Sequence, residues 1–120
     1  MLSRELFNTG GWIVGKIYLF NSPVLTDYGE WRFRGPLSAG AGRGLLAGGF
    51  VSAVGHPGAA AFLSAVLGLE VPCSRSTIRM ARGNRALVLR LRERLPEGRM
   101  LSLEEMHRLP FELGLLERID

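Results

Sequence analysis

A histidine stands at the junction between two apolar segments. Gly55-His56-Pro57-Gly58 follows the run Phe50–Val54, which predicts a strand, and precedes Ala59–Leu67, whose spacing predicts a helix ended by Gly68. Backbone N–H groups at a helix N-terminus bind phosphate, and the helix dipole there favours a neutral imidazole while a bound phosphate favours the imidazolium. His56 is therefore a candidate proton donor to a leaving oxygen, and Gly55 allows a ligand to approach the backbone closely. The alternative is a structural histidine in a turn.

Arginines concentrate in one segment of the chain. Between Arg75 and Arg99 there are eight arginines and only two glutamates. They are Arg75, Arg79, Arg82, Arg85, Arg90, Arg92, Arg94 and Arg99, with Glu93 and Glu97. Because a guanidinium binds phosphate through two parallel hydrogen bonds, this segment predicts a phosphate cradle. The alternative is a solvated strand face, since Ala86–Arg94 alternates leucines with arginines.

Three further side chains bear on this chemistry. Glu97, in Arg94-Leu95-Pro96-Glu97-Gly98, is a carboxylate that can orient an arginine or a ribose hydroxyl, or simply face water. We interpret His107 as a surface residue on a short helix and Cys73 as a small packing residue. A nucleophilic pair of Cys73 with His56 is the alternative, but no other residue pattern supports it.

The composition limits the class of protein. A chain of 120 residues, 47% hydrophobic, is expected to form one domain with its own core. A single cysteine excludes an internal disulfide and favours the cytoplasm, and one cysteine with two histidines cannot build a closed zinc site, so we expect no metal or cofactor. The net charge of +4 favours an anionic partner. We expect no signal peptide and no membrane partner, because the apolar stretch 51–71 is interrupted near its start.

The expected elements alternate between strands and short helices, which predicts an α/β fold with one mixed sheet. The expected strands are Lys16–Phe20, Glu30–Arg34, Phe50–Val54, Ser76–Met80, Ala86–Arg94 and an edge strand Phe111–Arg118. Expected helices lie within 37–49, at Ala59–Leu67 and after Ser102, where Glu105 completes a capping box. Gly35-Pro36 is expected to break the second strand. We expect residues 1–15 to be an N-terminal extension to a domain at 16–120.

Several segments together resemble the viral anti-CRISPR ring nucleases, a family with relatives in bacteria and phages. The resemblance covers roughly residues 16–120, and its order and spacing are more specific than any one piece. The matching segments are Lys16–Ser22, Phe50–His56, Phe62–Ser64, Leu67-Gly68, Val71-Pro72, Arg85–Val88, Arg94–Gly98 and Phe111–Leu116.

The resemblance implies a homodimer that binds cyclic tetra-adenylate across its two-fold axis. It implies cleavage of that ring without metal into linear products ending in a 2′,3′-cyclic phosphate, which switches off type III CRISPR signalling. His56 matches the family's catalytic histidine, and Arg94 and Glu97 match its other catalytic residues. The implied substrate-binding residues are Asn21, Ser22, Gly55, Arg75 and Arg94. No stable DNA binding is expected.

The chain departs from the family's pattern close to the histidine. Many relatives carry an acidic residue directly after it and a Thr two positions further on, where Pro57 and Ala59 stand here, and an Asn where Ser74 precedes Arg75. These departures keep open a second function, a protein that sequesters or senses a cyclic nucleotide with little turnover. A third is a basic RNA-binding module, which would lack an exposed aromatic stacking set because Trp31 and Phe33 are expected in the core.

Overall fold

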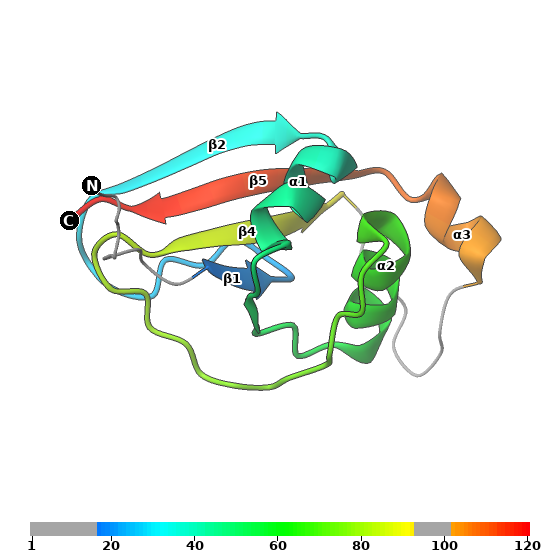
Figure 1. Ribbon diagram of the computed structural model, residues 1–120, viewed down its shortest axis with the longest axis horizontal. Coiled ribbons are helices and arrows are strands. Elements are labelled where there is room, and N and C mark those ends of the chain that lie inside the picture. The colour runs from blue at the N-terminus through cyan, green and yellow to red at the C-terminus, as the bar shows by residue number, and fades with distance from the viewer. Residues whose placement is uncertain (1–16, 93–101) are drawn as a thin grey trace.

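The computed structural model describes residues 17–92 and 102–120, except for the side chains of Leu103 and His107 (Figure 1). Its strands are β1 (Ile17–Phe20), β2 (Trp31–Leu37), β3 (Val51–Ser52), β4 (Arg85–Leu91) and β5 (Phe111–Arg118). Its helices are α1 (Ala39–Leu46), α2 (Pro57–Leu67) and α3 (Leu103–Arg108). The expected extension at residues 1–15 and the expected site residues Arg94 and Glu97 lie outside the described residues.

The five strands form one sheet in the order β2-β5-β4-β1-β3. β1 runs parallel to β3 on one side and to β4 on the other, with Phe20 opposite Val88. β5 is antiparallel to both β4 and β2, with Gly114 opposite Val88. This mixed sheet with short helices confirms the predicted fold class. Because β1, β3 and β4 are parallel, they end at one edge of the sheet, which we call the carboxyl edge.

Both faces of the sheet carry a core. α1 and α2 lie on one face (Figure 1), where Phe62 of α2 and Leu89 of β4 are fully buried. The opposite face of β1 and β4 is covered by connecting segments, with Met80 fully buried against it. Each such side chain contributes about 1.5–3 kcal/mol by leaving water. No helix among the described residues is long and apolar enough to cross a membrane.

Local signals fix the ends of the helices as the sequence predicted. Pro57 occupies the first turn of α2, where its missing N–H is no loss. Gly68 ends α2 in the left-handed conformation, with φ 68°. In α3 the Ser102 side chain accepts from the Glu105 backbone N–H at 3.1 Å, and the Glu105 carboxylate accepts from the Ser102 N–H at 2.9 Å, which confirms the capping box.

Two expected strands are placed differently. The segment Ser76–Met80 is not a strand; its alternating Ile78 and Met80 pack face-on against the sheet instead of pairing along an edge. Phe111–Arg118 is a strand but not an edge strand, because β2 pairs with its outer side and β4 with its inner side. β2 and β3 are the edges of this sheet.

Three smaller expectations also need correction. Gly35-Pro36 does not break β2, which continues to Leu37 with a shift of register; an edge strand tolerates the missing proline N–H. β3 is shorter than expected: the Ala53 N–H still donates to the Leu19 carbonyl of β1, but the carbonyl of the following residue, Val54, accepts from the Ser74 N–H instead. Phe33 is not in the core: 42% of it is exposed, and its ring lies over Gly114.

Candidate functional site

Three connecting segments leave the sheet at the carboxyl edge. Asn21 and Ser22 follow β1, Gly55 and His56 come shortly after β3, and Arg92 follows β4. Ligand sites in open α/β sheets form where parallel strands end, because the loops that follow neighbouring strands meet there. The fold therefore gathers residues that the sequence alone left in separate segments.

The His56 side chain is the N-cap of α2. Its Nδ1 atom accepts a hydrogen bond from the backbone N–H of Ala59 at 3.2 Å, and its backbone is extended, with φ −108° and ψ 119°. Because Nδ1 accepts this bond, the neutral ring carries its proton on Nε2. The side chain is partly exposed, and Nε2 forms no hydrogen bond with any other described residue. Among the described residues this nitrogen is thus left to meet a ligand.

Arg75 lies directly against the segment that carries the histidine. Its Nε–H donates to the Gly55 carbonyl oxygen at 3.0 Å, and a Cβ placed on Gly55 would lie 3.2 Å from the Arg75 Cγ atom. The backbone N–H of Ser74 donates to the Val54 carbonyl at 2.8 Å, which fixes the strand-like approach of the two segments. Because Nε is used in positioning, the two Nη groups of Arg75 are left to bind an anion.

A cavity of about 150 Å³ lies at the end of β1. Its lining combines apolar side chains with hydroxyl and amide groups. The lining residues are Phe20, Asn21, Ser22, Val24, Thr26, Ala53, Ser76 and Ile78. Asn21 and Ser22 come from the end of β1, and Ser76 is the residue after Arg75, which is not itself among the lining residues. It does not include His56, which stands outside its lining.

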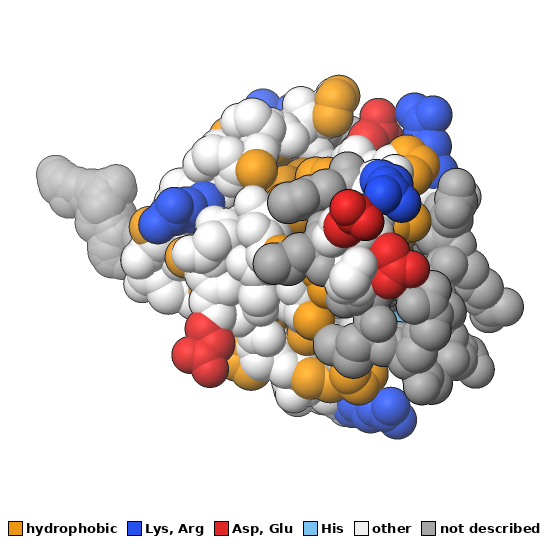
Figure 2. Space-filling view, turned by 90° about the vertical axis from the view of Figure 1, so that its right-hand side faces the viewer, with side chains coloured by type: hydrophobic (Ala, Val, Ile, Leu, Met, Phe, Trp, Pro, Cys, Tyr) orange, Lys and Arg blue, Asp and Glu red, His pale blue; other side chains and the backbone are white. Residues whose placement is uncertain are grey.

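Most of the described arginines in the arginine-rich segment are paired with carboxylates. Arg90 and Arg92 share Glu112, at 3.3 and 4.0 Å, and Arg82 lies 3.6 Å from Asp120. Figure 2 shows the side of the molecule to the right in Figure 1, where basic, acidic and apolar side chains are interspersed. In the described part of the segment, arginines are therefore interspersed with carboxylates over the surface. Arg75 is the arginine of this segment that contacts the residue before His56.

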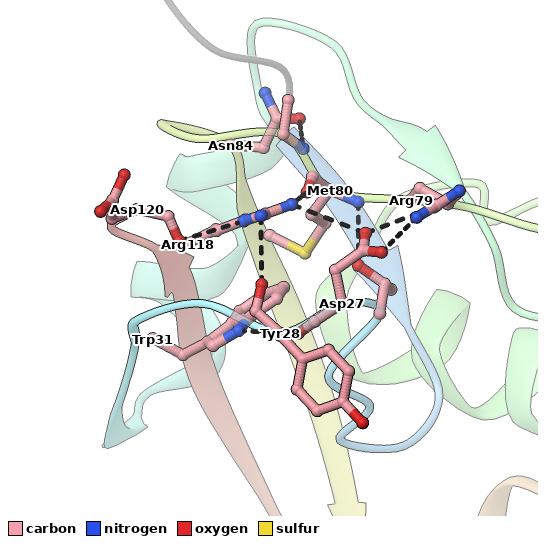
Figure 3. Close-up of polar contacts among 10 residues, drawn as sticks. Asp27, Tyr28, Trp31, Arg79, Met80, Asn84, Arg118 and Asp120 are labelled. Atoms are coloured by element: carbon pink, nitrogen blue, oxygen red, sulfur yellow. Dashed lines mark hydrogen bonds and ion pairs between the residues drawn. The ribbon is translucent and has the colours of Figure 1, made fainter.

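One cluster was not predicted from the sequence. Asp27 forms an ion pair with Arg79, and its Oδ2 atom lies 3.5 Å from Nη1 of Arg118 (Figure 3). The hydrogen bond from Arg79 holds the pKa of Asp27 below its usual range, and the same bond raises the pKa of Arg79. The partners are about fifty residues or more apart in the chain, so no local pattern signals the cluster.

The structure therefore places Arg75 against Gly55, the residue before His56, whereas Asn21 and Ser22 line the cavity, which includes neither His56 nor Arg75. Cys73 is exposed, which corrects its interpretation as a packing residue. His107 lies on the expected short helix α3. No group of three His, Cys, Asp or Glu side chains in residues 17–92 and 102–120 is placed to hold a metal ion. Thr26 and Ser76 line the cavity but were not identified from the sequence. The sequence predicts instead that Ser76 begins a strand.

These features define a small mixed α/β domain with a candidate ligand site at the carboxyl edge of its parallel strands. The model of the STIV B116-like family matches residues 17–113, so the chain belongs to this family. Its fold is similar to the solved structure of B116 of Sulfolobus turreted icosahedral virus, with a TM-score of 0.68 and 19% identity. That match covers 87% of this chain and all of that one, and it shows the shared fold.

Relatives occur in viruses and in a bacterium. ORF117 of Acidianus two-tailed virus is 37% identical over 71 residues, which are 58% of this chain and 61% of that protein. YddF of Bacillus subtilis is 32% identical over 73 residues, covering 61% of this chain and 68% of the relative. Protein 26 of Sulfolobus islandicus filamentous virus is 33% identical over 69 residues, covering 57% of this chain and 58% of the relative. The chain thus aligns with about three fifths of the two viral proteins.

Proposed function

We propose that this protein is a metal-independent ring nuclease that cleaves cyclic tetra-adenylate and so ends type III CRISPR signalling. The observation that carries the proposal is the position of His56 at the start of α2, with Nε2 unpaired among residues 17–92 and 102–120 and with Arg75 against the preceding residue. A phosphodiester placed there meets a proton donor and a guanidinium at once. The membership of viral proteins in the same family agrees with a role in virus–host conflict.

The proposed reaction needs no nucleophile from the protein. A ribose 2′-oxygen attacks the adjacent 3′-phosphorus, the P–O5′ bond breaks, and a 2′,3′-cyclic phosphate forms. The 2′-hydroxyl loses its proton to solvent, and the leaving 5′-oxygen takes up a proton. The protein must align these atoms for in-line attack and stabilise charge on the phosphoryl oxygens.

In this mechanism each described residue has a distinct task. The Nη groups of Arg75 bind phosphoryl oxygens, and Asn21 and Ser22 hold the nucleotide at the cavity rim. His56 supplies the proton to the 5′-oxygen. Arg94 and Glu97, which follow β4 in the sequence, complete the proposed catalytic set. A two-fold homodimer would present two copies of His56 to a four-fold ring, so two opposite cuts are expected.

A second candidate function rests on the hydrogen bond of the histidine. While Nδ1 accepts from the Ala59 N–H it carries no hydrogen, and a ring in this state offers the Nε2–H as a hydrogen-bond donor rather than as an acid. A protein held in this state would bind the cyclic ligand and sequester it with little turnover.

The two candidates are separated by incubating the protein with cyclic tetra-adenylate in EDTA. Linear products ending in a 2′,3′-cyclic phosphate support the nuclease. Intact ring that co-elutes with the protein supports the sequestering function. If the protein does not bind the ring at all, both candidates are excluded.

A further inference from the structure

Two irregular segments form the walls of the cavity at the carboxyl edge. The first loop, residues 21–30, contributes Asn21, Ser22, Val24 and Thr26, and the second loop, residues 72–84, contributes Ser76 and Ile78. Neither segment contains a helix or strand. Their separation is therefore set by side-chain contacts rather than by a regular ladder of backbone hydrogen bonds.

Arg118, at the end of β5, forms hydrogen bonds with both loops. Its Nη1 donates to the Met80 carbonyl of the second loop at 2.6 Å, and its Nη2 donates to the Tyr28 carbonyl of the first loop at 3.2 Å. The guanidinium also lies 5.6 Å from the centre of the Trp31 ring. Figure 3 shows these contacts of Arg118, and only 21% of its side chain is exposed.

Direct links between the loops complete the arrangement. The Thr26 hydroxyl oxygen accepts from the Met80 backbone N–H at 3.0 Å. Asp27 receives hydrogen bonds from Arg79 of the second loop and lies 3.5 Å from Arg118. Thr26 is itself a cavity wall, one residue from Asp27, and Ile78 is the residue before Arg79. The cluster thus holds the loops at the residues that line the cavity.

We propose that Arg118 is a positioning residue that sets the width of this cavity, and with it the affinity for the cyclic nucleotide. This inference rests on the proposed function. Without the fork of Arg118, the carbonyls of Met80 and Tyr28 lose their shared donor and Asp27 keeps one cation instead of two. The loops then separate at their base, and Ser22 and Ser76 no longer face one ligand at the same time.

The test compares Arg118→Gln with the control Arg82→Gln, which removes an exposed ion pair to Asp120 at the same end of the molecule. Four quantities are measured: the backbone amide chemical shifts of Ser22 and of Ser76 in the free protein, and KM and kcat for cyclic tetra-adenylate. We expect Arg118→Gln to move both amides and to raise KM about ten- to a hundredfold while kcat stays within a few fold, because misplaced binding groups weaken the complex. The control should leave all four quantities unchanged.

Unmoved amide shifts at Ser22 and Ser76 in a folded Arg118→Gln protein would overturn the inference, as would a fall in kcat with unchanged KM. If Arg118→Gln does not fold, Arg118→Lys is used, since it keeps the charge near Asp27 and loses the two-carbonyl fork. If wild-type protein neither binds nor cuts the ring, the proposed function fails. The amide chemical shifts then test by themselves whether Arg118 sets the width of the cavity, because they require no ligand.

Discussion

Replacing His56 by Asn and by Ala separates helix capping from proton donation. Asparagine is among the best N-cap residues, and alanine at an N-cap typically costs about 1 kcal/mol. Asn cannot serve as a general acid, a role that contributes roughly 10²–10⁴ in rate. Because the Nδ1 atom of His56 accepts the Ala59 N–H at 3.2 Å, both effects fall on one side chain.

The expected results differ between the two variants in stability and agree in activity. His56→Asn should unfold close to the wild-type temperature, whereas His56→Ala should unfold about 3–6 °C lower, the shift that about 1 kcal/mol produces in a domain of this size. Cleavage of cyclic tetra-adenylate should fall at least about a hundredfold in both. Binding of the ring should persist in both, because Arg75 and the cavity are untouched.

The assay pairs thermal unfolding by calorimetry with chromatography of the cleavage products in EDTA. Ser38→Ala is the matched control, since Ser38 caps α1 by accepting the Ala41 N–H at 3.0 Å and does not line the cavity at the carboxyl edge. It should lose stability as His56→Ala does and keep full cleavage. Undiminished cleavage by His56→Asn would refute the proton-donor role, and equal stability of the Asn and Ala variants would refute the capping argument.

Three further predictions concern other parts of the chain. Asp27→Asn should lower the free energy of unfolding at pH 7. Because the pKa of Asp27 is depressed in the folded protein, the stabilisation by its carboxylate is present above about pH 4 and disappears as the pH falls through that lowered pKa. The urea unfolding curves of wild type and variant should therefore converge in acid, and a difference in stability that persists there would contradict the prediction. Gly68→Ala should cost about 1–2 kcal/mol by urea unfolding, since φ there is 68°, whereas Gly48→Ala meets open space and should be near neutral; equal effects would show that the left-handed cap is unimportant. Arg75→Ala should raise the dissociation constant for the ring about tenfold or more in equilibrium dialysis, and unchanged affinity would remove Arg75 from the site.

Features decided within a few residues could be predicted from the sequence. The start and end of α2 follow from His56, Pro57 and Gly68, each of which has a local chemical reason to stand at a helix end. The capping box of Ser102 and Glu105 is equally local. For the same reason the placement of the histidine at a helix N-terminus, the central feature of the candidate site, was predictable.

Features decided by distant partners could not be predicted. Phe111–Arg118 closes the chain and is expected at an edge of the sheet, but β2 lies against its outer side and makes it internal. Ser76–Met80 is expected to be a strand, whereas its two apolar side chains, Ile78 and Met80, pack against a sheet formed by other segments. The pairing of Asp27 with Arg79 and Arg118 likewise depends on three segments meeting in space.

The cap of α2 links ligand binding to proton transfer in the proposed mechanism. For His56 to give up a proton it must first become an imidazolium, and then Nδ1 carries a hydrogen and no longer accepts from the Ala59 N–H. That N–H would be left unsatisfied at the positive end of the helix dipole unless another acceptor replaces Nδ1. A phosphate oxygen is such an acceptor, and its charge also favours the imidazolium. In the proposed mechanism the same phosphate would therefore accept the Ala59 N–H in place of Nδ1 and favour the protonated ring. His56 would then act as a proton donor while the substrate is bound. It would cap α2 again after the product leaves.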